Sequence, residues 1–316
     1  MAVNNYQIIV PDRLIRERVD FSIAQMLPEL SRNKIISVIK DKQATIKDKS
    51  FKAKDKIYGG EIIDFSWQEK ITTNWVPNNI ALDIVFEDDD IMVINKPAGL
   101  ITHPGNNNPD NTLANALLYY NPELAKVDRV GIVHRLDKDT SGLLVVAKNH
   151  HAQQHIIKQL KSREVKREYN AIIYNHLISG GTIDEPLGRD LRNRIKQTID
   201  ENGKEAITHY RIIEKFADFT LVKVMLETGR THQIRVHMAS ISYPLIGDGM
   251  YGKGLKFPKG ADVELKNALK GFKRQALHAK RLSFIHPTSG LKVSFKSELP
   301  KDMQDFLTII TKFNKF

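Results

Sequence analysis

The 316-residue sequence contains no cysteine. This absence excludes disulfide bonds, a thiolate nucleophile and any zinc site built from cysteines. The sequence also lacks a run of about 18 apolar residues, the length that a transmembrane helix needs. Its first residues, MAVNNYQIIVPDR, lack the apolar segment of a secretory signal peptide. We therefore predict a cytoplasmic protein that does not insert into a membrane.

Several catalytic motifs are missing as well. No phosphate-binding loop of the form GxxxxGK[ST] occurs, and GMYGKGLK lacks that spacing. Ser141 does not stand in the GxSxG motif of acyl-transferring serine enzymes. His232 and His237 are five residues apart, so on a helix they would point in different directions and would not form a zinc pair. The sequence therefore gives no support for a P-loop, serine acyl transfer or a histidine zinc site.

What the sequence has in excess is positive charge. It contains 48 Lys and Arg residues against 37 Asp and Glu, which gives a formal net charge of +11, and the excess is spread along the chain. Such a balance favours a polyanionic partner, most often nucleic acid, with an acidic membrane surface as the alternative. The length allows two domains with at least one sizeable core.

The first third of the chain combines helical and strand patterns. Residues 12–41 carry Val19 and Ile23, then Ile35 and Ile39, at helical spacing, which predicts two short helices. Short strands are predicted from there to residue 65, around Gly59-Gly60. The lysines of this region form either one phosphate-binding face or a solvated surface: Lys40, Lys42, Lys47, Lys49, Lys52, Lys54 and Lys56.

Residues 66–81, SWQEKITTNWVPNNIA, show no sustained period and read as a linker between a domain at 12–65 and a second at 82–316. The second domain opens with two predicted strands around an acidic turn, Glu87 to Asp90. This turn could hold a metal ion. We favour a solvated hairpin end, because no second carboxylate cluster follows at ligand spacing.

The stretch GIVHRLDKDTSGLLVVAKN, residues 131–149, places charged residues between two apolar runs. The runs at 130–133 and 143–146 are predicted as interior strands, and the turn residues at 139–142 predict a connecting loop. This loop would present Asp137 at the edge of a sheet, where a carboxylate is partly desolvated and held rigidly. The alternative is a carboxylate that only caps backbone amides.

Two further stretches place polar side chains beside predicted strands. In LETGRTHQIRVH, Arg230 follows a strand, and Thr231 is predicted to cap the next helix. The Arg230 guanidinium could pair with a carboxylate in the site or form a structural salt bridge. In VKREYNAIIYNH, Tyr169 lies in a predicted strand after Lys166 and Arg167. It either stacks on a base or packs in the core.

HRLDKDTSGLLVVAK, REY and LETGRTHQIRVH, in this order and spacing, resemble the RluA family of RNA pseudouridine synthases. The stretches INKPAGL, HPG, ITHYRI, GDGMYG and QALHAKRLSFIHPTSG also fit, so the resemblance covers residues 12–300. The pattern around LPELSRNKI resembles the S4 RNA-binding domain. The fold implied is α+β, with a mixed, largely antiparallel sheet in the catalytic domain and a small S4-like α/β domain before it. The strand-rich pattern supports this class independently.

The resemblance also implies a chemistry. The family breaks the C1′–N1 bond of uridine, turns the uracil and joins C1′ to C5, without a cofactor. Asp137 matches the essential aspartate, which either attacks the sugar or base or removes the C2′ proton. Arg230 matches the arginine that pairs with it, and Tyr169 matches the aromatic that packs on the flipped uracil. RNA contacts are expected from His134, Arg135, Arg32, Lys34, Lys166, Arg167, His232 and Arg235.

The substrate implied is large-subunit ribosomal RNA, 23S, free or in a precursor particle, with no obligatory protein partner and no metal. Two alternatives remain open. One is a non-catalytic RNA-binding protein of ribosome assembly that keeps the fold, against which the intact Asp137, Tyr169 and Arg230 argue. The other is a metal-dependent nuclease that uses Asp88 to Asp90, which a chelator would inactivate.

Overall fold

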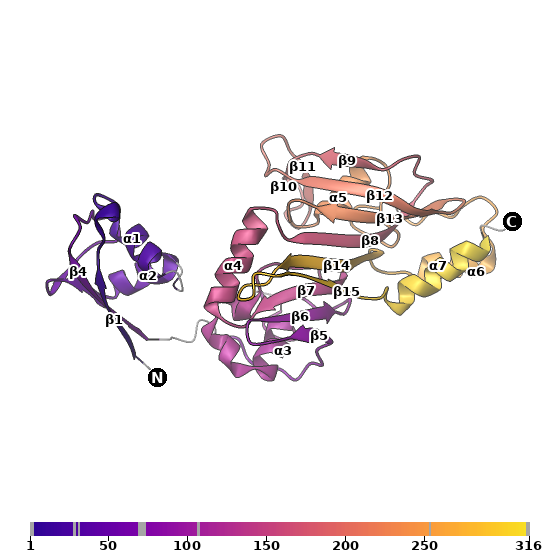
Figure 1. Ribbon diagram of the computed structural model, residues 1–316. Coiled ribbons are helices and arrows are strands. Elements are labelled where there is room, and N and C mark those ends of the chain that lie inside the picture. The colour runs from indigo at the N-terminus through magenta and orange to yellow at the C-terminus, as the bar shows by residue number, and fades with distance from the viewer. Residues whose placement is uncertain are drawn as a thin grey trace.

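The computed structural model describes residues 3–27, 30, 32–68, 74–105, 108–252 and 254–313. In Figure 1 the chain forms a small N-terminal body and a larger C-terminal body. Between them, residues 69–73 of the predicted linker lie outside the described part, and residues 74–81 have no regular secondary structure. Among the helices that are described, none is long and apolar enough to cross a membrane.

The N-terminal body is an antiparallel sheet packed on two helices. Both predicted helices are present, and Val19, Ile23 and Ile35 from them are buried with Phe65 of the sheet. The first strand lies before residue 12 and pairs with the last, which continues past residue 65, so the sheet extends beyond the limits predicted for this domain. In sheet order the strands are β1 (Val3–Ile9), β4 (Ile62–Gln68), β2 (Ala44–Ile46) and β3 (Lys49–Ser50), and the helices are η1 (Asp12–Leu14), α1 (Val19–Met26) and α2 (Arg32–Lys40).

The C-terminal body is built on one large sheet. Within the described residues nine strands form it; β7 and β14 pair in parallel, and the other neighbours pair antiparallel. This confirms the predicted mixed, largely antiparallel α+β architecture. In sheet order the strands are β5 (Ile84–Glu87), β6 (Ile91–Lys96), β7 (Ser141–Ala147), β14 (Leu277–Ile285), β8 (Lys166–Tyr174), β13 (Phe219–Leu226), β12 (Ile207–Lys215) and β9 (Gly181–Asp184), and β15 (Lys292–Lys296) pairs with β14.

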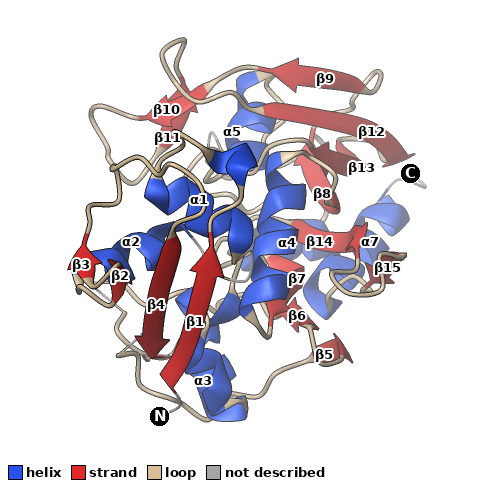
Figure 2. Cartoon of the chain, turned by 60° about the vertical axis from the view of Figure 1, so that its left-hand side comes forward, coloured by secondary structure: helices blue, strands red, loops and turns tan. Residues whose placement is uncertain are grey.

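Helices cover both faces of this sheet (Figure 2). Leu144 and Val146 of β7 pack on the face that carries α3 and α5, whereas Leu143 and Val145 pack toward α4. Burial on both faces explains why β7 is continuously apolar from Leu143 to Ala147 rather than alternating. The helices are α3 (Leu113–Tyr120), η2 (Pro122–Lys126), η3 (Asp128–Gly131), α4 (His150–Lys161), α5 (Gln233–Ser240), α6 (Val263–Gly271) and α7 (Lys301–Phe313). A separate hairpin consists of β10 (Leu187–Arg189) and β11 (Gln197–Ile199).

The strand predicted at residues 130–133 is not formed. Residues 128–131 make the 3-10 turn η3, and Ile132 makes only an isolated bridge to Val146 of β7. Gly131 explains the difference. It has φ of 75°, and a Cβ at this position would lie 1.9 Å from the carbonyl oxygen of Ala147, so the chain turns against the end of β7 instead of running beside it. The segment therefore turns into the loop that carries Asp137.

Candidate active site

The loop that carries Asp137 is fixed by buried hydrogen bonds. The ammonium group of Lys96 is fully buried and donates to the carbonyl oxygens of Pro97, Leu100 and Lys138 at 2.8–3.0 Å. Thr102 Oγ1 donates to the carbonyl oxygen of Leu136 at 2.8 Å. The carbonyls on both sides of Asp137 are thus bound from beneath. This supports the predicted position at a sheet edge, where the carboxylate is held rigidly.

His134 and Gly142, which belong to the same motif, hold the loop in place. His134 Nε2 accepts a hydrogen bond from the backbone N–H of Val145 at 3.1 Å, and burial lowers the pKa of His134 to about 3. The imidazole is therefore neutral and ties the loop to β7. At the other end, Gly142 has φ of 112°, and a Cβ would come within 2.4 Å of the Ala279 carbonyl oxygen of β14.

Asp137 opens into a cavity of about 600 Å³. Most of the predicted site residues line it. Lys166 does not; it is exposed, and its ammonium donates to the Arg163 carbonyl oxygen. Arg32 and Lys34 lie in α2 of the N-terminal body, where Arg32 pairs with the buried Asp20. The predicted residues at the cavity are Asp137, Tyr169, Arg230, His134, Arg135, Arg167, His232 and Arg235.

The arginine that reaches Asp137 is Arg235, not Arg230 as predicted. Arg235 Nη1 lies 3.3 Å from Asp137 Oδ2. Arg230 is exposed at the cavity rim, and its Nε donates to the carbonyl oxygen of Glu205 at 2.9 Å. The Asp137 side chain itself is 18% exposed. The Asp137 carboxylate is thus partly desolvated and paired with Arg235, which makes the contact that was predicted for Arg230.

Arg235 is held in turn by Asp248. Two hydrogen bonds of 2.7 and 2.9 Å join the guanidinium to this carboxylate, which is almost fully buried. Burial alone would raise the pKa of Asp248, but the Arg235 hydrogen bonds and the backbone N–H groups of Tyr251 and Met250 lower it. The guanidinium also lies over the Tyr251 ring, 5.0 Å from its centroid. Arg235 is thus preorganised to face Asp137.

His232 lies on the other side of the carboxylate. Its Nε2 is 3.9 Å from Asp137 Oδ1, and its Nδ1 is 2.8 Å from the Tyr251 hydroxyl. That hydroxyl already accepts a hydrogen bond from the backbone N–H of Gln197. Its own proton therefore goes to His232 Nδ1, since the described residues provide no other acceptor for it. Burial lowers the pKa of His232 against the opposing effect of Asp137. The ring is neutral and presents Nε2–H toward Asp137 and the cavity.

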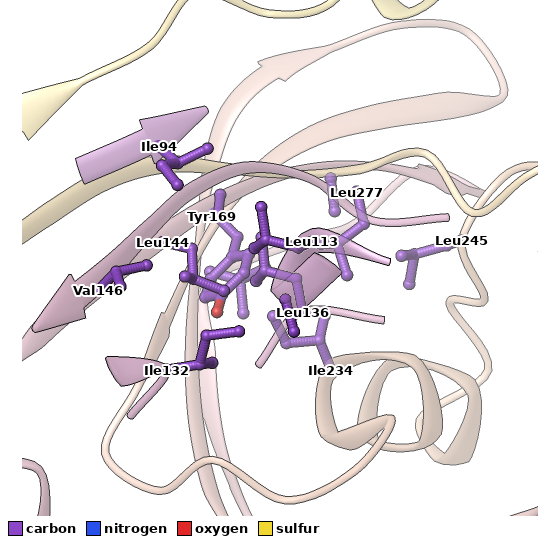
Figure 3. Packing of buried hydrophobic residues seen from close by; sticks show 14 of the residues in the cluster. Ile94, Leu113, Ile132, Leu136, Leu144, Val146, Tyr169, Ile234, Leu245 and Leu277 are labelled. Atoms are coloured by element: carbon purple, nitrogen blue, oxygen red, sulfur yellow. The ribbon is translucent and has the colours of Figure 1, made fainter. Parts of the chain in front are cut away.

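Tyr169 forms part of the cavity wall. Figure 3 shows its ring among Ile132, Leu136 and Leu144, and the side chain is 6% exposed. Burial raises the pKa of Tyr169; the charge of Arg167 lowers it and that of Asp137 raises it. The hydroxyl is therefore protonated at neutral pH. Within the described residues it has no hydrogen-bond partner, which leaves it available to a ligand.

The GRTHQ turn is organised by Gln233, which the sequence analysis did not single out. Its side chain accepts from the backbone N–H of Arg230 and from Thr228 Oγ1, and donates to the carbonyl oxygen of Ile207. The helix α5 begins at Gln233 and its N-cap is His232, in the left-handed region with φ of 57°, so Thr231 is not the cap as predicted. His237 points away from the cavity toward Thr208 and Glu185.

The acidic turn is a hairpin end between β5 and β6, as predicted. Asp88 accepts from the backbone N–H groups of Asp90 and Ile91 and contacts His286, while Asp90 contacts Thr288 and Asn149. The carboxylates of Asp88 and Asp90 are thus engaged by protein donors. In the part of the chain that the structure describes, no group of three or more His, Asp or Glu side chains is placed to hold a metal ion.

The cavity thus presents a partly buried carboxylate, paired with Arg235, beneath an opening lined by further arginines. Comparison with known proteins identifies the class of protein. The family model for RNA pseudouridylate synthase matches residues 90–240. The chain belongs to this family, which makes it an enzyme that isomerises uridine in RNA, and the predicted resemblance is confirmed.

Individual relatives narrow this further. The chain is 45% identical over 304 residues to a protein of Xanthomonas campestris named ribosomal large subunit pseudouridine synthase D, covering 96% of this chain and 92% of the relative. A protein of the same name from Xylella fastidiosa is 46% identical with the same coverage. The structure of human RNA pseudouridylate synthase domain containing 4 matches with a TM-score of 0.57 at 24% identity, covering 72% of this chain and 92% of that one, and so shares the fold.

Proposed function

We propose that this enzyme isomerises uridine to pseudouridine in large-subunit ribosomal RNA, with Asp137 as the initiating group. The observation that carries the proposal is the meeting of Asp137, Arg235 and Tyr169 in one cavity. The relatives named for the ribosomal large subunit support the choice of RNA. Precursor particles are included among the proposed substrates.

Asp137 initiates the reaction in one of two ways. Its carboxylate attacks the sugar or the base covalently, or it removes the C2′ proton so that the C1′–N1 bond breaks. Both routes need a carboxylate of fixed orientation, which the pairing with Arg235 and the buried hydrogen bonds of the loop supply. The uracil then turns, and C5 bonds to C1′ as Asp137 is released from its adduct or returns the C2′ proton. The C5 proton leaves while N1 takes up a proton, so the reaction involves no net redox change.

Tyr169 and the rim residues handle the nucleotide. The target must leave the RNA stack to reach Asp137, which costs a few kcal/mol by the usual magnitude of base flipping. The Tyr169 ring packs against the uracil. Because its raised pKa keeps the phenol protonated, it is a weak base, and we assign it packing and proton relay rather than phenolate chemistry. Arg135 and Arg230, both exposed at the rim, would contact the RNA backbone.

The N-terminal body supplies the remaining affinity. We assign it the role of an S4-like RNA-binding domain, spanning the predicted residues 12–65 together with the flanking strand β1. Two helices on a small sheet with exposed lysines support this assignment. Arg32 and Lys34 of α2 and the lysines at 42–56 would lie along the RNA backbone.

The test is release of tritium to solvent from large-subunit RNA labelled at uridine C5, with chelator present. Wild type should release tritium, because re-attachment through C5 displaces that hydrogen. Asp137→Asn keeps the size of the side chain but removes the charge, so it should release none while binding RNA with similar affinity. Asp139→Asn, in the same loop, is the matched control and should stay active.

Turnover by Asp137→Asn would contradict the assignment of Asp137. Tritium release that chelator abolishes would favour metal-dependent chemistry. Absence of release from every large-subunit RNA and precursor particle, with tight binding retained, would favour a non-catalytic assembly factor.

A further inference from the structure

Within the described part of the chain, Arg167 is a buried cation without a carboxylate partner. It lies in β8 and is 8% exposed. Its Nη2 donates to the carbonyl oxygen of Glu227 at 3.2 Å, while its Nε is buried and has no hydrogen-bond partner in the described residues. Burial lowers the pKa of Arg167, and the only opposing effect is that of the Tyr169 hydroxyl. Buried charges are normally paired, so this one is exceptional.

The carboxylates of the cavity wall, Asp137, Glu205 and Glu227, are already engaged by other cations. Glu227 accepts from Arg163 at 3.0 Å and from His209 at 2.7 Å. Glu205 pairs with the other side of Arg163. Arg235, the other buried arginine of the cavity, has two carboxylates within 3.3 Å. The positive charge of Arg235 is thus balanced by carboxylates of the protein. The charge of Arg167 is not, so it can be balanced by a bound anion.

The backbone next to Arg167 is shaped for this side chain. A Cβ at Gly229 would lie 2.5 Å from Arg167 Nη1, and the other atoms near that position also belong to the Arg167 guanidinium. Glycine at 229 therefore makes room for the guanidinium at the cavity wall, where both residues lie. Because φ at Gly229 is outside the left-handed region, alanine is compatible with the backbone there, and only the arginine would have to move.

The positions of Arg167 and Tyr169 along β8 indicate which anion fits. Arg167 and Tyr169 are two residues apart, on the same face of the strand, about 7 Å along it. This separation is comparable with that between a nucleotide's base and its own phosphate. A guanidinium offers phosphate a planar set of N–H donors. We propose that Arg167 binds the phosphodiester group of the nucleotide whose uracil packs on Tyr169. This proposal rests on the proposed function.

The first experiment needs no RNA and uses inorganic phosphate as the probe. The midpoint of thermal unfolding is measured at constant ionic strength with rising phosphate for wild type, Arg167→Met, Gly229→Ala and Arg211→Met. Arg211 is the matched control, since it is an exposed arginine whose guanidinium, among the described residues, donates to the Tyr210 carbonyl oxygen alone. Wild type and Arg211→Met should gain stability from phosphate, whereas Arg167→Met and Gly229→Ala should gain much less.

Stability without phosphate separates ligand binding from a structural role. Arg167→Met removes an unpaired buried charge and keeps a long side chain, so its midpoint should equal or exceed that of wild type. A purely structural arginine predicts the opposite. A lowered midpoint with an unchanged gain from phosphate would overturn the proposal. If Arg167→Met fails to fold, Gly229→Ala carries the test, because it retains every charge.

A second experiment links the site to RNA. In the tritium assay, Arg167→Met and Gly229→Ala should raise the KM for RNA about tenfold or more, the usual effect of losing a hydrogen bond to a charged group. The slope of log affinity against log salt concentration should decrease in magnitude by about 1 for Arg167→Met. Unchanged KM in both variants would contradict the proposal. If wild type were inactive, the proposed function would fail while the phosphate titration still decided the role of Arg167.

Discussion

At the scale of single residues, the hydrogen-bond donors that face Asp137 are held in place by other side chains that do not contact Asp137. Asp248 orients Arg235, and the Tyr251 hydroxyl orients His232. Both supporting residues come from GDGMYG, which was recognised in the sequence only as part of the family pattern. A tyrosine hydroxyl that donates to Nδ1 leaves the proton on Nε2. The tautomer of His232 is therefore a property of the folded protein that can be measured directly.

Removing the Tyr251 hydroxyl should release this constraint. In Tyr251→Phe, His232 Nδ1 loses its donor, so the Nε2–H tautomer should give way to a mixture, and turnover should fall by several-fold for about 1 kcal/mol of lost hydrogen bonding. ¹⁵N NMR of the histidine rings measures the tautomer. His237, bound to Thr208 and to the Glu185 carbonyl, is the internal control and should not change. Nδ1–H at His232 in wild type would contradict the assigned network.

The choice between Arg230 and Arg235 could not be made from the sequence. Both follow the same strand, and a helix capped by Thr231 would have left Arg230 beside the loop. The left-handed turn at His232 and the buried side chain of Gln233 instead begin the helix later. Arg235 then lies within the first turn of α5, facing Asp137. The placement of Asp137 in a loop and of Tyr169 in a strand was predictable from local strand and turn patterns, whereas the roles expected of them came from the family resemblance.

At the scale of elements, two glycines bracket the Asp137 loop. Gly131 packs against the end of β7, and Gly142 packs against β14. Strands β5 to β8 and β13 follow from apolar runs in the sequence, and so does α3, which Thr112 and Asn115 cap. The strand predicted at 130–133 was wrong, because β-branched residues suggest an extended chain while the close contact at Gly131 with Ala147 is not visible in sequence. Such contacts join segments far apart in the chain.

Gly131→Ala should therefore destabilise the protein by more than the cost of placing alanine at a positive φ, because the new Cβ also clashes with Ala147. Gly99→Ala is the matched control: φ is 89° at Gly99 and 75° at Gly131, but a Cβ at Gly99 meets nothing within 4 Å. The control should lose about 1 kcal/mol of unfolding free energy. Gly131→Ala should lose at least about 2 kcal/mol more, the scale of overpacking. Urea unfolding measures the free energy of unfolding of both variants. Equal losses would show that η3 can shift to make room for the Cβ without loss of stability.

At the scale of the whole molecule, the positive charge is divided between the two bodies. The catalytic cavity gathers several arginines, while the N-terminal body exposes lysines on and around β2 and β3. Each phosphate contact adds about 0.7 to 0.9 to the slope of log affinity against log salt. The division predicts that affinity and chemistry can be weakened separately, since the N-terminal lysines and Asp137 belong to bodies with separate hydrophobic cores.

Replacing Lys47, Lys49 and Lys52 with Gln tests this division. All three are exposed, so folding should be unaffected. If they bind RNA phosphates, the salt slope should fall by up to about 2 to 3 and KM should rise, while kcat at saturating RNA stays unchanged. Lys273, Lys292 and Lys296, exposed on the C-terminal body, are the matched control with the same loss of charge. Equal slopes for the two triple variants would show that net charge alone, and not an RNA-binding face on the N-terminal body, sets the affinity.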